Sequence, residues 1–245
     1  MALPALVLVH GGAVAGDCWD LTVEQIHRLE PDLDVLAVDL PGRRGKPGDL
    51  GTLTIADWVD SVVRDIEDAG LDNLVIVGHS MAGLTVPGVV TKLGSSRVRE
   101  VILAAACVPA EGAAMVDVIS RPMGPVARRN GKKGDPYELP PMLPNYLFLN
   151  GVSRRRRRFM DGRLYPESSQ VLLEKVSRHG LPDDVPRTWI FTLHDRTHPA
   201  KEQRASIAAI GGVQTLIEID TCHCLMVSEP ERLAEILVGR SRLRV

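Results

Sequence analysis

A serine stands among small residues in the run GHSMAG (78–83), directly after the apolar run LVIV (74–77). On a tight turn from a strand into a helix the backbone of the serine is strained, so small residues must flank it. The pattern is usually G-x-S-x-G, and Ala82 stands in place of the last glycine. Such a turn exposes the hydroxyl at a helix N-terminus, where N–H groups favour negative charge. Ser80 is therefore a candidate nucleophile, and the alternative is that it only caps the helix.

A serine hydroxyl needs a base to remove its proton, and the base needs an acid that fixes its tautomer. Of the seven histidines, His223 follows the last expected strand and precedes an expected helix. Asp195 ends the run TWIFTLHD (188–195), so its loop should open beside that of His223 at the carboxyl edge of a sheet. We predict Asp195 as the acid. Glu111 and Asp117 follow another expected strand and are competing candidates, and a carboxylate that caps a helix is the alternative role for Asp195.

Attack of a serine on a carbonyl creates an oxyanion that needs hydrogen-bond donors. The N–H of Met81, at the expected start of the helix, is one candidate. The run HGG (10–12) offers a second, and Gly12 is the best placed because glycine lets the backbone approach a substrate closely. A plain turn is the alternative for this run. We also expect Gly11 to line the site.

The remaining histidines and cysteines do not form a metal-binding pattern. His79 adjoins the serine, but its side chain should point away, and His10 should order a loop or be buried with its hydrogen bonds satisfied. His194 and His198 are spaced as two ligands could be, but no third ligand is evident. The run CHC (222–224) has poor spacing for a metal and no matching pair elsewhere. The sequence therefore predicts neither a metal nor a cofactor.

Short apolar runs predict the strands that must position these residues. Amphipathic stretches with helical spacing separate them, for example 17–30 and 55–70, where Gly70 indicates the end of the helix. Strands that alternate with helices give right-handed crossovers and a mostly parallel sheet covered on both faces. The fold class is therefore α/β, with a central sheet of about six strands. The expected strands are 3–10, 35–38, 74–77, 98–106, 188–193 and 213–219.

Residues 107–184 break this alternation of strands and helices. The segment is rich in Pro and Gly and contains no strand of the buried type, although 167–180 returns to helical spacing. We expect this segment to be an insertion that folds over the sheet as a cap. The core would then consist of residues 1–106 and 185–245, and the whole chain would form a single compact domain.

Aromatic residues and methionines gather in the insertion, although aromatic residues make up only 4% of the chain. Apolar walls suit a hydrophobic substrate and exclude water from the site. The alternative is that these side chains merely pack the insertion on the core. The residues predicted to bind substrate are Gly11, Trp19, Met142, Tyr146, Phe148, Phe159, Tyr165 and Met226, and Tyr137, Leu143 and Met160 are further candidates.

Charge and composition limit the other partners. A net charge of −2 and a pI of about 6.4 give no basic field that would attract nucleic acid. The arginines 154–158 should be a solvated face, with attraction of an anionic substrate or partner as the alternative. We expect no signal peptide, and no apolar run approaches the length of a membrane span. Four scattered cysteines suit a reducing compartment, so we predict a cytoplasmic protein, with the insertion as a candidate homodimer contact.

Five stretches together resemble the α/β-hydrolase family over nearly the whole chain. They are LVLVHGG, VDLPGRRGKPGD, VIVGHSMAG, TLHDRTHPAKEQ and IDTCHCLMVSEPERLAEIL. The order Ser, Asp, His along the chain is also that of this family. The short N-terminus is similar to that of the branch with plant methylesterases and hydroxynitrile lyases. This resemblance implies a triad of Ser80, His223 and Asp195, an oxyanion hole from Gly12 and Met81, and a cap over the site.

Two departures from that branch bear on the reaction. Plant hydroxynitrile lyases of this type carry threonine at the position of Gly11 and lysine just after the catalytic histidine, where Cys224 stands here. Without that lysine no cation is evident to receive cyanide. The resemblance therefore implies hydrolysis of a carboxylic ester or lactone of a hydrophobic small molecule through an acyl-enzyme. Ser80 argues against epoxide hydrolases and haloalkane dehalogenases, whose nucleophile is aspartate. A lyase on the same scaffold and a non-catalytic ligand-binding protein are the alternatives.

Overall fold

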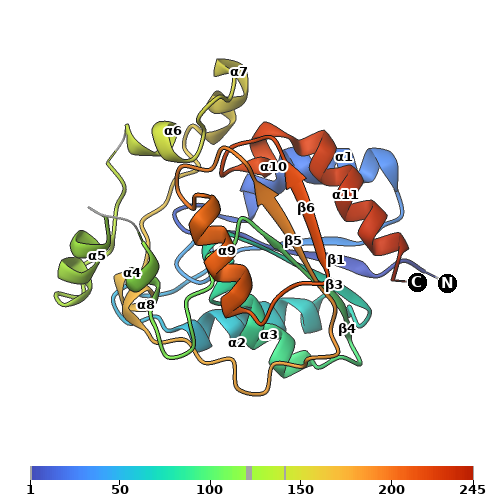
Figure 1. Cartoon of the computed structure of the whole chain (residues 1–245), viewed down its shortest axis with the longest axis horizontal. Coiled ribbons are helices and arrows are strands. Elements are labelled where there is room, and N and C mark those ends of the chain that lie inside the picture. The colour runs from blue at the N-terminus through green and yellow to red at the C-terminus, as the bar shows by residue number, and fades with distance from the viewer. Residues whose placement is uncertain (1, 120–122, 141, 245) are drawn as a thin grey trace.

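The strands form one six-stranded sheet in which every neighbouring pair is parallel, in the order β2-β1-β3-β4-β5-β6. The computed structural model describes residues 2–119, 123–140 and 142–244 (Figure 1). Each expected apolar run overlaps one of these strands, although β3 extends two residues beyond its run and β5 begins one residue earlier. The predicted α/β class is confirmed, and the sheet is wholly parallel. The strands are β1 (Ala5–Val9), β2 (Val35–Val38), β3 (Leu74–His79), β4 (Val98–Ala104), β5 (Arg187–Thr192) and β6 (Thr215–Ile219).

Helices cover both faces of the sheet (Figure 1). On one face α1 (Asp20–Leu29) packs against α11 (Pro230–Arg242), beside α10 (Leu225–Ser228). The helices of the opposite face are α2 (Ile55–Asp68), α3 (Val86–Leu93) and α9 (Ala200–Ala209). The expected stop of α2 is confirmed, because Gly70 has a φ of +65° just beyond the helix. Among the helices of the described residues, none is both long enough and apolar enough to cross a bilayer.

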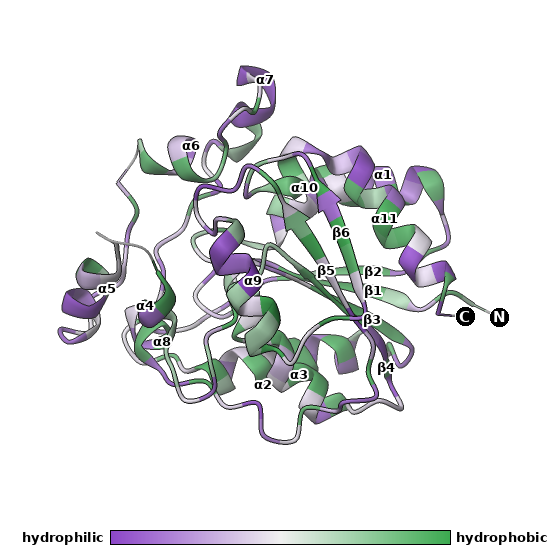
Figure 2. Cartoon of the chain, in the orientation of Figure 1, coloured by the Kyte–Doolittle hydropathy of each residue, from purple (hydrophilic) through white to green (hydrophobic). Residues whose placement is uncertain are grey.

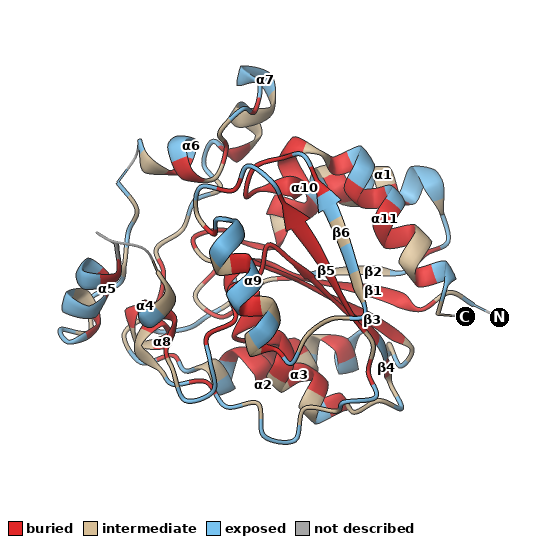
Figure 3. Ribbon diagram, viewed as in Figure 1, coloured by how far each residue is buried: buried red, intermediate tan, exposed pale blue. Residues whose placement is uncertain are grey.

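Alternate residues of the central strands enter two separate hydrophobic cores. In β1, Val7 and Val9 belong to the core under α2 and α3, whereas Leu6 and Leu8 belong to the core under α1 and α11. The inner strands β1, β3, β4 and β5 are accordingly apolar along most of their length (Figure 2) and mostly buried, whereas the edge strands β2 and β6 are partly exposed (Figure 3). A sheet buried on both faces holds the carboxyl ends of its strands in fixed positions, and the candidate site lies at those ends.

The segment between β4 and β5 carries only short helices in its described residues. Its last part, 167–180, is not the long helix that the spacing predicts, because α8 ends at Leu173. Ser168 caps the start of α8, and the chain then pairs with 113–114: Val176 N donates to Ala113 O, and Lys175 forms a bridge with Ala114. The helices of this segment are α4 (Met115–Val118), α5 (Met123–Gly131), α6 (Leu143–Leu147), α7 (Arg154–Arg157), η3 (Arg158–Met160) and α8 (Ser169–Leu173).

Candidate active site

Ser80 begins η2 (Ser80–Gly83), the turn between β3 and α3. Its φ of +52° lies in the left-handed region that L-residues rarely adopt, so the backbone here is strained. The turn is also crowded: a Cβ on Gly78 would lie 2.7 Å from Val86 Cγ2, and one on Gly83 would lie 2.3 Å from Cys107 O. The Ser80 hydroxyl bonds to His223 and not to a helix N–H, so the helix-cap alternative is wrong.

The three side chains singled out by the sequence form a continuous hydrogen-bonded chain. Ser80 Oγ and His223 Nε2 lie 2.8 Å apart, and His223 Nδ1 lies 2.7 Å from Asp195 Oδ2. A carboxylate only accepts hydrogen bonds, so Nδ1–H donates to Asp195 and Nε2 is left to accept the serine proton. All three residues are buried, which keeps water from competing for these bonds.

Three donors besides His223 hold the Asp195 carboxylate. Its carboxylate accepts hydrogen bonds from Thr192 Oγ1 (3.0 Å), Thr197 N (2.8 Å) and His198 N (2.7 Å). Burial by itself would raise the pKa of the Asp195 carboxyl, but His223 and these donors outweigh it and hold the pKa below its usual value. Asp195 is therefore a charged acceptor in a fixed orientation.

The competing acids lie elsewhere. Glu111 accepts a hydrogen bond from Arg178 N (2.9 Å). Asp117 accepts one from Ala114 N (2.8 Å) and pairs with Arg128. Neither contacts His223, so the competition is settled in favour of Asp195 as the partner of that ring.

His79 holds the backbone of the loop that carries His223. Its Nε2 donates to the carbonyl of His223 (2.9 Å), and the two ring centroids are 4.8 Å apart. Burial lowers the pKa of His79 to about 3, so the ring is neutral. This contact between His79 and His223 was not anticipated from the sequence.

Two other histidines, His10 and His194, have partners outside the Ser80–His223–Asp195 chain. His10 is buried, its Nδ1 donates to Gly11 O (2.7 Å), and its Nε2 accepts from Leu40 N (3.1 Å). His194 is exposed and pairs with Asp220 at 2.6 Å. Within the described residues no three His, Cys, Asp or Glu side chains are grouped as a metal site would require.

Gly12 and Met81 lie together next to Ser80. A Cβ on Gly12 would be 2.8 Å from Met81 Sδ, so a side chain there would displace the methionine. Within the described residues neither N–H donates to a protein acceptor, which leaves both groups open to a substrate. They remain the candidate oxyanion donors.

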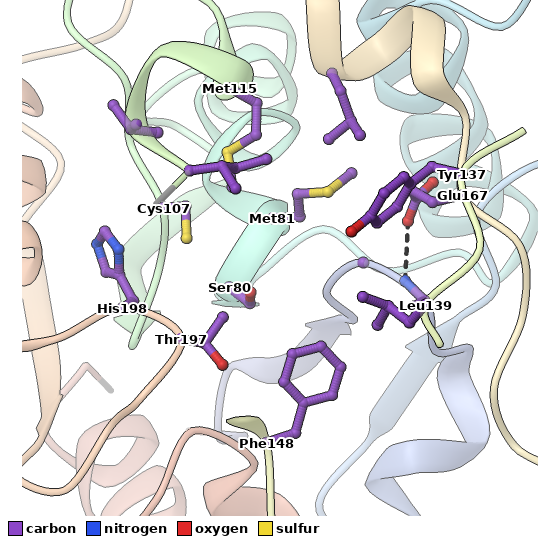
Figure 4. A pocket seen from close by; sticks show the side chains of 15 residues that line it. Ser80, Met81, Cys107, Met115, Tyr137, Leu139, Phe148, Glu167, Thr197 and His198 are labelled. Atoms are coloured by element: carbon purple, nitrogen blue, oxygen red, sulfur yellow. Dashed lines mark hydrogen bonds between the residues drawn. The ribbon is translucent and has the colours of Figure 1, made fainter. Parts of the chain in front are cut away.

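Ser80 lies in a pocket with mostly apolar walls (Figure 4). The pocket contains about 690 Å³ of empty space, including the part open to solvent. The walls come from the loops after β1, β3, β4 and β5 and from the insertion. The lining residues are Gly12, Ala13, Ser80, Met81, Cys107, Met115, Val118, Ile119, Tyr137, Leu139, Phe148, Glu167, Leu172, Thr197 and His198.

A sequence model of the alpha/beta hydrolase family matches residues 6–236, a range that includes all three residues of the hydrogen-bonded chain and all the strands except Ala5 at the start of β1. The chain belongs to the alpha/beta hydrolase family. The predicted family is thus confirmed, and the hydrolase fold explains why the Ser80 and His223 loops meet at one edge of the sheet.

Similar proteins align with this chain over most of their length. The hydrolase is 25% identical to a pyrethroid hydrolase from Sphingobium wenxiniae over 256 residues, which cover 97% of this chain and 87% of that protein. An extracellular alpha/beta-hydrolase from a Paenibacillus species superposes with a TM-score of 0.82 and 20% identity, covering 96% of this chain and 98% of that one. A methylesterase from Arabidopsis superposes with a TM-score of 0.78 and 17% identity, covering 98% and 100%.

Three side chains predicted to bind substrate instead pack the core of the hydrolase beside α1. Trp19 is fully buried, and its ring meets that of His79 edge-on with the centroids 6.3 Å apart. Met226 is buried in the same core, and Phe159 is half-buried against it under the guanidinium of Arg163. None of the three lines the pocket, so these predictions are wrong, and the alternative of core packing holds.

Other predicted pocket residues lie outside or beneath the pocket. Met142 and Tyr146 are 84% and 60% exposed at the outer side of the insertion, around α6 (Figure 3). Tyr165 is half-buried and contacts the loop after β1 through its backbone. Gly11 lies under the nucleophile, because a Cβ there would be 2.8 Å from Ser80 Cβ. Of the eight predicted residues only Phe148 lines the pocket, with its ring 5.6 Å from that of His223.

Several lining residues were missed by sequence reasoning. Cys107 follows β4, and Thr197 and His198 follow β5, so the rule that sites gather at the carboxyl ends of parallel strands would have found them. Burial raises the pKa of the Cys107 thiol to about 12, so it is neutral. Met115 and Glu167 come from the insertion, and no motif in the sequence marks them.

Proposed function

We propose that this protein is a serine hydrolase that cleaves carboxylic esters or lactones of hydrophobic small molecules through an acyl-enzyme. The observation that carries the proposal is the hydrogen-bonded chain Ser80–His223–Asp195 at the wall of an apolar pocket. The names of two similar proteins, a pyrethroid hydrolase and a methylesterase, support the same chemistry. No cofactor enters the reaction.

The proposed reaction has two steps that use the same groups. His223 Nε2 takes the Ser80 proton as Oγ bonds to the ester carbonyl carbon, and the N–H groups of Gly12 and Met81 donate to the oxyanion. The carbon–oxygen bond to the alcohol then breaks, and His223 returns the proton to the leaving oxygen. Water attacks the acyl group in the same way, with His223 as its base, and the acid leaves as Ser80 regains its proton.

Hydroxynitrile lyase activity is less well supported by this site than ester hydrolysis. The threonine that such lyases carry at position 11 would begin with a Cβ 2.8 Å from Ser80 Cβ and 3.0 Å from His79 Nδ1. Cys224 carries a thiol, which is neutral or anionic and never a cation, so position 224 supplies no positive charge for cyanide. Both observations favour hydrolysis.

Replacement of the nucleophile tests the proposal. We expect wild type to hydrolyse p-nitrophenyl butyrate, and Ser80→Ala to lower kcat by roughly 10³-fold or more because no acyl-enzyme forms. A fluorophosphonate should label wild type at the peptide containing Ser80 and should not label the variant. His194→Ala, which changes an exposed histidine paired with Asp220, is the matched control and should keep full activity.

Three results would contradict the proposal. A fully active Ser80→Ala would remove the nucleophile from the mechanism. Tight ligand binding by wild type without turnover of any ester or lactone would favour a binding protein. Release of cyanide from mandelonitrile at a rate above that of ester hydrolysis would favour the lyase.

A further inference from the structure

A buried ion pair lies beside the pocket and has no part in the steps above. Arg43 Nη2, from the loop after β2, lies 2.5 Å from Glu167 Oε1 of the insertion. Arg43 is 0% exposed and Glu167 is 2% exposed. Removing two charges from water costs free energy that the pair alone often fails to recover, so the partners around it are informative.

Both members of the pair bind the loop that follows β1. Glu167 Oε2 accepts a hydrogen bond from Ala13 N (2.9 Å, dashed in Figure 4), and Arg43 Nε donates to Val14 O (3.1 Å). The N–H of Tyr165, two residues before Glu167, donates to Ala13 O (3.0 Å). The insertion therefore engages both the N–H and the carbonyl of Ala13.

Ala13 needs such contacts because its backbone is strained. Its φ of +59° is a left-handed conformation that residues with a Cβ adopt only where the surroundings impose it. The residue before it is Gly12, whose N–H is the proposed oxyanion donor. A Cβ on Gly12 would lie 3.1 Å from Glu167 Oε2, so the carboxylate lies directly against this part of the loop.

We propose that Glu167, with its charge balanced by Arg43, is a positioning residue that fixes the Gly12 N–H for the oxyanion. This inference rests on the proposed ester hydrolysis. Oxyanion donors act through preorganised geometry, and a shift of about 1 Å can cost about 10²-fold in rate. The charge on Glu167 shortens and strengthens its bond to Ala13 N–H, which a neutral acceptor would hold less firmly. The insertion then positions an oxyanion donor as well as lining the pocket.

Two substitutions of Glu167 separate the effect of its charge from the effect of its side-chain length. Glu167→Gln keeps an oxygen for Ala13 N–H but leaves Arg43 without a counter-charge. Glu167→Asp keeps the charge for Arg43 but draws the carboxylate back from Ala13. We expect each variant to lower kcat for p-nitrophenyl butyrate by about tenfold or more with KM within about threefold, because the donor acts in the transition state. The rate of fluorophosphonate labelling should fall in parallel, since it forms a similar oxyanion.

Glu174 offers a matched control in the same insertion. Its Oε2 accepts a hydrogen bond from Ile55 N (2.6 Å) at the start of α2, and it does not line the Ser80 pocket. Glu174→Gln therefore alters the same kind of contact between insertion and core, and should leave kcat and the labelling rate at the wild-type level.

The outcomes distinguish this inference from the proposed function. Thermal unfolding shows which variants fold. If Glu167→Gln does not fold, the test is made with Glu167→Asp, which retains the ion pair. Folded variants with wild-type kcat and labelling rates would overturn the positioning role and leave ester hydrolysis intact. A rise in KM alone, or a lower Tm with kcat unchanged, would also overturn it. A fully active Ser80→Ala would remove the proposed function itself.

Discussion

The Asp195 carboxylate accepts hydrogen bonds from four different groups, which together fix its orientation. The hydroxyl of Thr192, the N–H groups of Thr197 and His198, and the His223 ring all point at one carboxylate. An acceptor-only group suits this environment, whereas an amide would direct its own N–H atoms at donors. The orientation and tautomer of His223 therefore depend on the chemical type at position 195 as well as on its shape.

Asp195→Asn is the corresponding test. The amide keeps the size of the side chain but cannot accept from every donor and has no charge to stabilise the imidazolium. We expect kcat for p-nitrophenyl butyrate to fall by about 10³- to 10⁴-fold with KM little changed. Asp220→Asn, which alters an exposed carboxylate paired with His194, is the control and should retain activity. A loss below about tenfold in a folded Asp195→Asn would show that His223 is oriented by other contacts.

At the scale of the elements, the strands were predictable and the insertion was not. A buried parallel strand is a continuous apolar run, and this pattern identified all the strands and the loops that carry Ser80, Asp195 and His223. The helices of the insertion are short, for example 4 residues in α4 and 5 in α6, so periodicity cannot say which side each apolar residue faces. Met142 and Phe148 look alike in the sequence, yet one is exposed and the other lines the pocket.

The two kinds of insertion residue should differ in their effect on substrate choice. Met115 of α4 lines the pocket and is 6% exposed, so Met115→Ala removes part of an apolar wall and enlarges the site. We expect the ratio of kcat/KM for p-nitrophenyl octanoate over butyrate to change by about tenfold, since truncating a buried methionine alters apolar contacts by about 1–3 kcal/mol.

Tyr146→Ala is the comparison, because this ring is exposed and stacks under Arg196. It should leave the ratio of the two esters within about twofold. An equal effect of both substitutions would mean that the insertion rearranges before substrate binds.

At the scale of the whole molecule, burial keeps several histidines uncharged. Burial lowers the pKa of His10 and of His79 to about 3, and that of His198 to about 4. His10 directly follows β1, His79 ends β3 next to Ser80, and His198 lines the pocket, so their neutral state depends on the packing of the site. In the unfolded chain the same side chains return to an ordinary pKa near 6.5.

Acid should therefore destabilise this fold well above the pKa of its carboxylates. Below about pH 6.5 the three histidines bind protons in the unfolded chain but stay neutral in the folded chain. Their contribution to the free energy of unfolding is therefore complete above that pH and decreases as the pH falls toward 4.

Below that pH, the free energy of unfolding falls by about 1.4 kcal/mol per pH unit for each ring, and the three together remove about 4 kcal/mol between pH 8 and pH 5.5. A typical domain has only about 5–15 kcal/mol of stability, so Tm should fall steeply over this range. His10→Gln, which retains a donor and an acceptor for Gly11 O and Leu40 N, should reduce the dependence of stability on pH by about a third. A Tm that stays level from pH 8 to pH 5.5 would mean that these rings accept protons without unfolding the chain.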